Sequence, residues 1–175
     1  MAKKKKDKTV YYDPRSVKDK LTLINLYKNE DFLYPILVEL FKSQDYKDVR
    51  VNHGTDEYGK DIVFKTDSPH FSVWYACVVK NKGLKMRDIV NGGDIYQQIN
   101  MAFNIKYSDC VYSDIKIDKV FVITDGTYSR KDCDKPLESL PQKNNIILWN
   151  STKLQNEIEK HIKITTMVLE TTKNN

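Results

Sequence analysis

The chain has 175 residues, and its 29 lysines and arginines against 24 aspartates and glutamates give a formal charge of +5. Its length suits one domain with a real core, and 40% hydrophobic with 30% charged residues is typical of a soluble globular protein. These values argue against a disordered or fibrous chain. No apolar run approaches the roughly 18 residues that a membrane-spanning helix needs.

The positive charge is concentrated at the N-terminus. Residues 3–8 hold five lysines and one aspartate, a net charge of +4 that leaves about +1 for the rest of the chain. No apolar stretch follows, so the segment is not a secretory signal. Clustered lysines can hold nucleic acid loosely through phosphates, but many such tails are only solvated, so charge alone does not establish a nucleic-acid partner. We expect residues 1–12 to form a flexible basic tail.

The three cysteines are Cys77, Cys110 and Cys133. Their number is odd and they lack the CxxC spacing of a zinc site, which disfavours both a disulfide framework and a cysteine-based metal centre. A reducing cytoplasm fits this pattern best.

Two helices are predicted in the first quarter of the chain. Asp13-Pro14 is typical of a helix start, and an apolar residue recurs every three or four positions after it. A second helix is predicted from about Asp31 to Gln44 because its apolar side chains form one stripe. The members of that stripe are Leu33, Ile36, Leu37, Leu40 and Phe41.

The pattern then changes to that of strands. Residues 48–51 alternate, residues 53–59 read as a loop, residues 60–65 predict a strand, residues 67–70 a turn, and residues 71–80 a long strand. Gly92-Gly93-Asp94 precedes a helix, and the continuous apolar run over residues 119–124 predicts a strand covered on both faces. A short helix near residues 131–140, a strand at 146–149 and a final helix beginning at Asn150-Ser151 complete the order.

This order predicts an α/β sandwich, because strands separated by helices usually pair in parallel. Its mixed sheet should begin as an antiparallel meander. We expect a single domain over residues 13–165, followed by a frayed end or linker over residues 166–175.

Asp61 and Lys80 are the pair that points to chemistry. If the turn is centred near His70, antiparallel pairing places Asp61 opposite residues close to Val79, and Val78 shares a face with Lys80. A carboxylate can hold Mg²⁺, and a nearby ammonium can orient a water and offset charge on a phosphate. Glu39, at the edge of its helix's apolar stripe, is a candidate second carboxylate. Alternatively, Asp61 and Lys80 form an ordinary ion pair and Glu39 is solvated.

The arrangement resembles the restriction-endonuclease-like, PD-(D/E)XK, superfamily and is most similar to its Mrr-type nuclease domains, which open larger bacterial defence proteins. The resemblance runs from about Asp31 to His161. The matching pieces are Glu39, Gly59-Lys60-Asp61-Ile62-Val63-Phe64, Val79-Lys80, Gln97-Gln98 and Lys119-Val120-Phe121-Val122-Ile123-Thr124-Asp125-Gly126.

This resemblance implies a three-layer α/β/α sandwich and Mg²⁺- or Mn²⁺-dependent cleavage of DNA, preferentially double-stranded, in an anti-phage or restriction effector. Asp61 and Glu39 would hold the metal, and Lys80 would position the attacking water. The resemblance also implies a domain that works as a homo-oligomer or within a larger chain.

One position departs from the superfamily pattern. The acidic or glutamine residue two positions before Lys80 is Val78, which cannot bind a metal. Three explanations stay open: another side chain (Glu57, Asp56 or Gln98) supplies the oxygen, the strand register differs, or the domain has lost cleavage and kept a nucleic-acid-binding or assembly role.

Three further residues are candidates for supporting roles. Gln98 lies on the inward arc of its helix, where it either lines the site or only hydrogen-bonds at the core margin. Lys82 and Lys85 follow the Lys80 strand and are candidates for phosphate contacts, although surface lysines commonly have no specific role.

Overall fold

The computed structural model describes residues 10–11, 33–52, 57–67, 69–81, 83–90, 92–129, 133, 136–161 and 168–169. Five strands form one mixed sheet in the order β2-β3-β4-β5-β6. The strands are β2 (Lys47–Val51), β3 (Ile62–Asp67), β4 (Ser72–Lys80), β5 (Lys119–Thr124) and β6 (Ile146–Trp149). The first three form an antiparallel meander, and β4, β5 and β6 run parallel. The predicted mixed sheet is confirmed.

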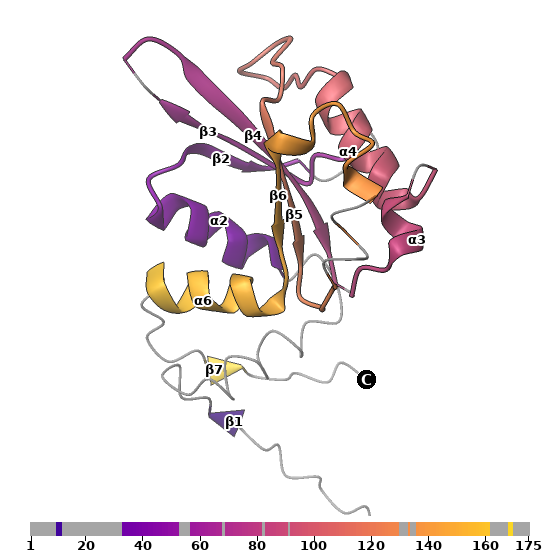
Figure 1. Ribbon diagram of the computed structural model, residues 1–175. Coiled ribbons are helices and arrows are strands. Elements are labelled where there is room, and N and C mark those ends of the chain that lie inside the picture. The colour runs from indigo at the N-terminus through magenta and orange to yellow at the C-terminus, as the bar shows by residue number, and fades with distance from the viewer. Residues whose placement is uncertain are drawn as a thin grey trace, which may run out of the picture.

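Helices cover both faces of this sheet. The helices α2 (Leu33–Ser43) and α6 (Ser151–His161) lie on one face, and α3 (Met86–Ile89) and α4 (Asp94–Asn104) lie on the other (Figure 1). The predicted three-layer α/β/α arrangement is confirmed. A 3₁₀ turn, η2 (Lys143–Asn145), leads into β6.

The sheet separates two apolar clusters, and the strands alternate between them. In β4, Val78 belongs to the cluster under α4, whereas Cys77 and Val79 belong to the cluster under α2 and α6. The predicted division of β4 into two faces is therefore confirmed, as expected for a pleated strand with a period of two. Phe41 of α2 stacks on Phe64 of β3, with ring centroids 4.1 Å apart, and anchors the helix to the sheet.

Most predicted boundaries hold within one or two residues. Residues 119–124 and 146–149 form strands as predicted, and Asn150 caps α6 by accepting a hydrogen bond from the N–H of Lys153 (2.9 Å). The strand predicted over residues 60–65 instead covers Ile62–Asp67, because residues 57–61 are occupied by a turn. The short helix α3 was not predicted.

Several expectations fall outside the described residues. These include the helix after Asp13, most of the basic tail, and much of the helix predicted near residues 131–140. A two-residue antiparallel ribbon pairs β1 (Val10–Tyr11) with β7 (Val168–Leu169), a contact between distant segments that the sequence pattern did not indicate. Over the described ranges, no helix has the length and apolar character to cross a bilayer.

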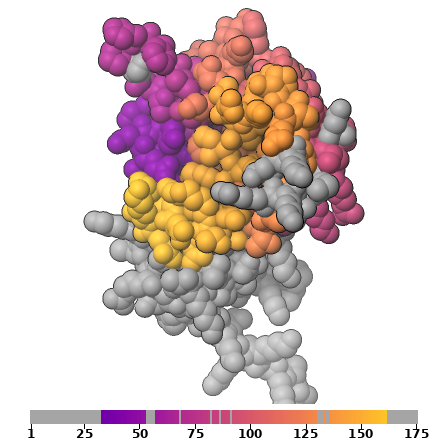
Figure 2. Space-filling view, viewed as in Figure 1, coloured from indigo at the N-terminus to yellow at the C-terminus, as the bar shows by residue number. Residues whose placement is uncertain are grey.

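The hairpin that joins β3 to β4 projects beyond the body of the domain, as the space-filling view shows (Figure 2). Its register keeps Asp67 opposite Ser72, so the strands stay paired almost to the tip. Because β4 and β5 run parallel, their amino-terminal ends lie together at one edge of the sheet and their carboxyl ends lie at the opposite edge.

Candidate active site

A tight turn leads into β3 and carries the candidate acids. The N–H of Lys60 donates to the carbonyl of Glu57 (2.9 Å), and the two residues between them, Tyr58 and Gly59, have positive φ angles of 45° and 72°. This is the pattern of a type I′ turn, in which both central residues adopt left-handed conformations. The turn brings Glu57 back toward Asp61.

Gly59 holds the turn against α4. A Cβ atom at this position would lie 2.1 Å from the carbonyl oxygen of Gln98, so only glycine permits the approach. The Glu57–Asp61 turn is thereby fixed to the middle of α4 at the edge of the sheet where β4 ends.

Asp61 is almost fully buried, with 6% of its surface exposed. Its backbone N–H donates to the carbonyl of Cys77 (2.8 Å), and its Oδ2 accepts a hydrogen bond from the N–H of Val79 (2.6 Å). The prediction placed Asp61 opposite residues close to Val79. The backbone lies nearer Cys77, but the carboxyl group reaches Val79.

The environment of Asp61 disfavours its charged form. Burial is the main cause that raises its pKa to about 7, and a hydrogen bond shared with Glu57 acts in the same direction. The N–H of Val79 and the positive charge of Lys80 act in the opposite direction without cancelling the effect. The structure thus brings Asp61, Glu57 and Lys80 together. The sequence pattern predicted the proximity of Asp61 and Lys80 but not the contact with Glu57.

Val78 lies in the core and takes no part in this group. Its side chain is completely buried in the apolar cluster under α4, among neighbours that include Ile95 and Ile99. Of the two replacements for the missing acid that the structure describes, Glu57 and Gln98, Glu57 is the one that contacts Asp61. One of its oxygens, Oε2, is itself shielded from solvent.

Glu39 is not brought to this group. It lies on α2, which covers the opposite face of the sheet, and its exposed carboxylate pairs with Lys42 at 3.3 Å. The physical reason lies in the helical wheel: Ile36 is only partly buried at the margin of the stripe, and Glu39 lies about 60° further from the core. The expectation of a stripe-edge carboxylate reaching the site is therefore not met.

Gln98 supports the site through its backbone carbonyl and not through its side chain. Gln98 directs its side chain along its own helix and donates from Nε2 to Asp94 (2.9 Å), while its backbone carbonyl receives the turn at Gly59. Its neighbours Ile95, Ile99 and Ala102 are buried as predicted. Asp56 and Lys82 lie outside the described residues.

Lys60 is a buried cation that the sequence pattern did not reveal. Only 1% of its surface is exposed, and burial lowers the pKa of its amine to about 8. The amine donates to the carbonyl of Tyr58 (3.4 Å) and lies 5.7 Å from the centre of the Tyr58 ring. Alternation along a strand assigns faces but does not indicate that a lysine beside a turn is enclosed.

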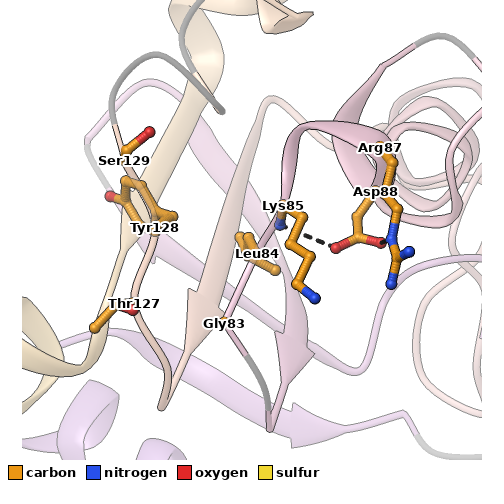
Figure 3. A pocket seen from close by; sticks show the side chains of 8 residues that line it. All are labelled: Gly83, Leu84, Lys85, Arg87, Asp88, Thr127, Tyr128 and Ser129. Carbon is orange, nitrogen blue, oxygen red and sulfur yellow. Dashed lines mark hydrogen bonds and ion pairs between the residues drawn. The ribbon is translucent and has the colours of Figure 1, made fainter.

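A pocket of about 680 Å³ opens beyond the carboxyl ends of β4 and β5 (Figure 3). Lys85, Arg87 and Asp88 form one side and Thr127 to Ser129 form the other. Asp88 accepts a hydrogen bond from the N–H of Lys85 (3.0 Å) and lies 3.8 Å from the Arg87 guanidinium, toward which it points in Figure 3. Lys85 is exposed, as its predicted role in phosphate contact requires.

The chemistry of Asp61 and Glu57 fits a magnesium ion. Mg²⁺ in proteins is commonly held by one or two carboxylates, with water and substrate phosphate completing its octahedron. Two carboxyl groups that share a hydrogen bond can supply that number of protein ligands. Within the described part of the chain, no cluster of three or more His, Cys, Asp or Glu side chains is arranged around a common point.

No protein-family model matches the chain, and a search of curated proteins finds no match. Two solved structures are similar to it at low identity. One is the MspJI restriction endonuclease in complex with a 27-mer oligonucleotide, with 14% identity and a TM-score of 0.46 over 81% of this chain and 30% of that one. The other is the restriction endonuclease FokI bound to DNA, with 11% identity and a TM-score of 0.44 over 83% of this chain and 28% of that one. The chain thus spans less than a third of either protein.

Proposed function

We propose that this chain is a metal-dependent nuclease domain that hydrolyses phosphodiester bonds in DNA. The observation that supports this most directly is the contact between Glu57 and Asp61, within the electrostatic reach of Lys80. Glu57 supplies the oxygen that Val78 lacks. The active site is then formed by the Glu57–Asp61 turn and the end of β4.

Asp61 and Glu57 would hold Mg²⁺ or Mn²⁺ in this account. A bound divalent cation polarises the phosphodiester and lowers the pKa of a coordinated water. The N–H of Val79 fixes one carboxylate oxygen of Asp61, which keeps the group in one orientation. The ammonium group of Lys80 orients the attacking water and offsets negative charge on the phosphate.

Phosphate contacts are proposed at the pocket beyond β4 and β5. Lys85 and Arg87 line it at the same edge of the sheet as Lys80, so a duplex approaching the site would meet these cations. Lys82 is proposed to add to them. Replacing Lys85 with alanine should lower DNA affinity similarly for all sequences and reduce the slope of log affinity against log salt by about one.

Plasmid cleavage tests the assignment. With Mg²⁺ or Mn²⁺ at pH 8, wild type should cut, and Asp61→Ala, Lys80→Ala and Glu57→Gln should each lose about a hundredfold or more in rate. Glu39→Ala is the matched control, because it removes an acid of the same predicted role that the structure places elsewhere. It should cut at the wild-type rate.

The assignment fails if all variants, purified in parallel, cut as fast as wild type, which would indicate a contaminant. It also fails if Glu39→Ala alone loses activity, because that would put the site on the other face of the sheet.

A degenerate module is the second candidate, and the complete burial of Val78 favours it. In that case wild type would bind DNA with strongly salt-dependent affinity and would not cut with any divalent metal. The substitution Val78→Glu is a poor test of lost activity, because it would place a carboxylate in the apolar cluster under α4. Cleavage by wild type that requires Glu57 separates the two candidates.

The wider setting is proposed from the resemblance to Mrr-type domains. We place the domain over residues 13–165, in a bacterial restriction or anti-phage effector that acts on double-stranded DNA in the cytoplasm. Cys77, Cys110 and Cys133 are free thiols, as a reducing compartment would keep them. Light scattering on the isolated chain tests whether it forms the proposed homo-oligomer or remains a monomer that needs a larger chain.

A further inference from the structure

A second pocket, of about 590 Å³, lies at the edge of the sheet opposite the candidate active site. It is built where β4 and β5 begin, whereas Lys80 is the last residue of β4. Ser72 and Lys80 are eight residues apart along the strand, which corresponds to roughly 26 Å. The pocket is therefore distinct from the site proposed for hydrolysis, and its volume lies in the range of about 300–1,000 Å³ found for small-molecule sites.

Four separate segments form the walls of this pocket. Phe71 lies directly before β4, Phe103 and Asn104 lie at the end of α4, Lys116 lies before β5, and Gln142 and Asn145 belong to the turn before β6. Phe71 is 65% exposed, although it is a large apolar residue, while Phe103 is buried. An exposed aromatic ring at the mouth of a pocket offers a surface on which a planar group can stack.

Gln142 supplies a hydrogen-bond acceptor that is not used within the described part of the protein. Its Oε1 is buried and accepts no hydrogen bond there. A buried amide oxygen without a donor is costly, and a ligand N–H group would offset that cost. Gln142 lines the pocket, so its amide is a polar group that such a donor would meet there.

Positive charge predominates at this pocket. The lining residues include Lys116, Lys119 and a single carboxylate, that of Asp118, which already accepts a hydrogen bond from the N–H of Trp74 (2.8 Å). Lys116 makes no ion pair with another described residue, and the amine of Lys119 lies 6.0 Å from the centre of the Tyr75 ring. An anionic group is the complement of such a surface.

We propose that this pocket binds one nucleotide, with its base against Phe71, an amino group of the base donating to Gln142, and its phosphate at Lys116 and Lys119. A nucleotide unites the three properties that the walls select: a planar ring, N–H donors and negative charge. The same unit occurs free and within a single strand, and the recognition chemistry is common to both.

Isothermal titration calorimetry with the full chain tests the proposal. AMP should bind, and adenosine and ribose 5-phosphate should each bind at least about tenfold more weakly, since each lacks one of the recognised groups. Gln142→Leu, Phe71→Ala and Lys116→Glu should each weaken AMP binding about fivefold or more. Lys106→Glu is the matched control, because Lys106 is an exposed lysine that pairs with Asp114 outside the pocket.

A single-stranded oligo(dA) of four residues separates the two sources of the nucleotide. Tighter binding of the strand assigns the pocket to nucleic acid, and tighter binding of AMP assigns it to the free nucleotide. The proposal is overturned if neither binds at millimolar concentration, if ribose 5-phosphate binds as well as AMP, or if Lys106→Glu and Lys116→Glu weaken binding equally. Melting curves of each variant show whether the fold is kept.

Discussion

Two aspartates that are shielded from solvent to different degrees, Asp61 directly before β3 and Asp109 in the loop after α4, have pKa values shifted in opposite directions. Partial burial alone would raise the pKa of Asp109, but hydrogen bonds from the Tyr107 hydroxyl, two backbone N–H groups and Arg50 outweigh it and hold that pKa well below its ordinary value. Asp61 receives one hydrogen bond from the N–H of Val79 and shares another with Glu57, and its pKa is raised.

The difference distinguishes Asp109, an acid that stabilises the fold, from Asp61, which we propose to be available for chemistry. Asp109 fastens the loop after α4 to the meander, where Tyr112 donates to Asp48 (2.6 Å) and lies beneath the guanidinium of Arg50. Its lone pairs are used by the protein itself. Asp61 sits in a site that penalises its charge, and a cation bound there would relieve the penalty.

Removing Asp109 should have the largest effect on stability. Asp109→Ala leaves Arg50 and two backbone N–H groups without their acceptor, so the free energy of unfolding should fall by about 4 kcal/mol. The control is Lys106→Ala, which removes an exposed pair with Asp114 and should change stability by less than about 0.5 kcal/mol. Urea denaturation at pH 7 measures both, and equal losses would show that the Asp109 network has no special weight.

The raised pKa of Asp61 should make the free energy of unfolding depend on pH. Because its pKa in the folded chain is raised, the folded state holds more protons than the unfolded one between about pH 4 and pH 7, so stability falls as pH rises through this window. Asp61→Asn removes that titration. Its stability relative to wild type should therefore rise by on the order of 3 kcal/mol from pH 4 to pH 8, measured without divalent metal. A difference that stays constant with pH would contradict the raised pKa.

The turn that presents Glu57 should depend on Gly59. Gly59→Ala adds a Cβ that would clash with the carbonyl of Gln98, and it also strains a positive φ. We expect a loss of about 2 kcal/mol and slower cleavage. Gly92→Ala is the control, because Gly92 also has a positive φ but has open space around it. It should lose about 1 kcal/mol from backbone strain alone. Equal losses would show that contact with α4 does not hold the turn.

Periodicity and pairing rules were sufficient for most of the scaffold. The apolar run over residues 119–124 predicted a strand because both faces of β5 are buried. The stripe from Leu33 to Phe41 predicted a helix because one face of α2 is buried. The pairing of Asp61 with Lys80 followed from hairpin register. These are local regularities of period two or 3.6.

The rest of the site depended on contacts that such patterns do not encode. Glu57 joins Asp61 because two successive left-handed residues reverse the chain and α4 receives Gly59. Lys60 is enclosed for the same reason. Glu39 was misjudged because Ile36 is itself at the margin of the apolar stripe, and Glu39 lies about 60° further from the buried Leu37 and Leu40.

Manganese binding followed by the paramagnetic resonance signal of free Mn²⁺ tests the central claim most directly. At pH 8, wild type should bind the ion, Asp61→Asn and Glu57→Gln should each weaken binding by at least about tenfold, and Glu39→Gln should match wild type. If Asp61→Asn binds Mn²⁺ as tightly as wild type, or if Glu39→Gln is the variant that loses it, the turn before β3 is not the metal site.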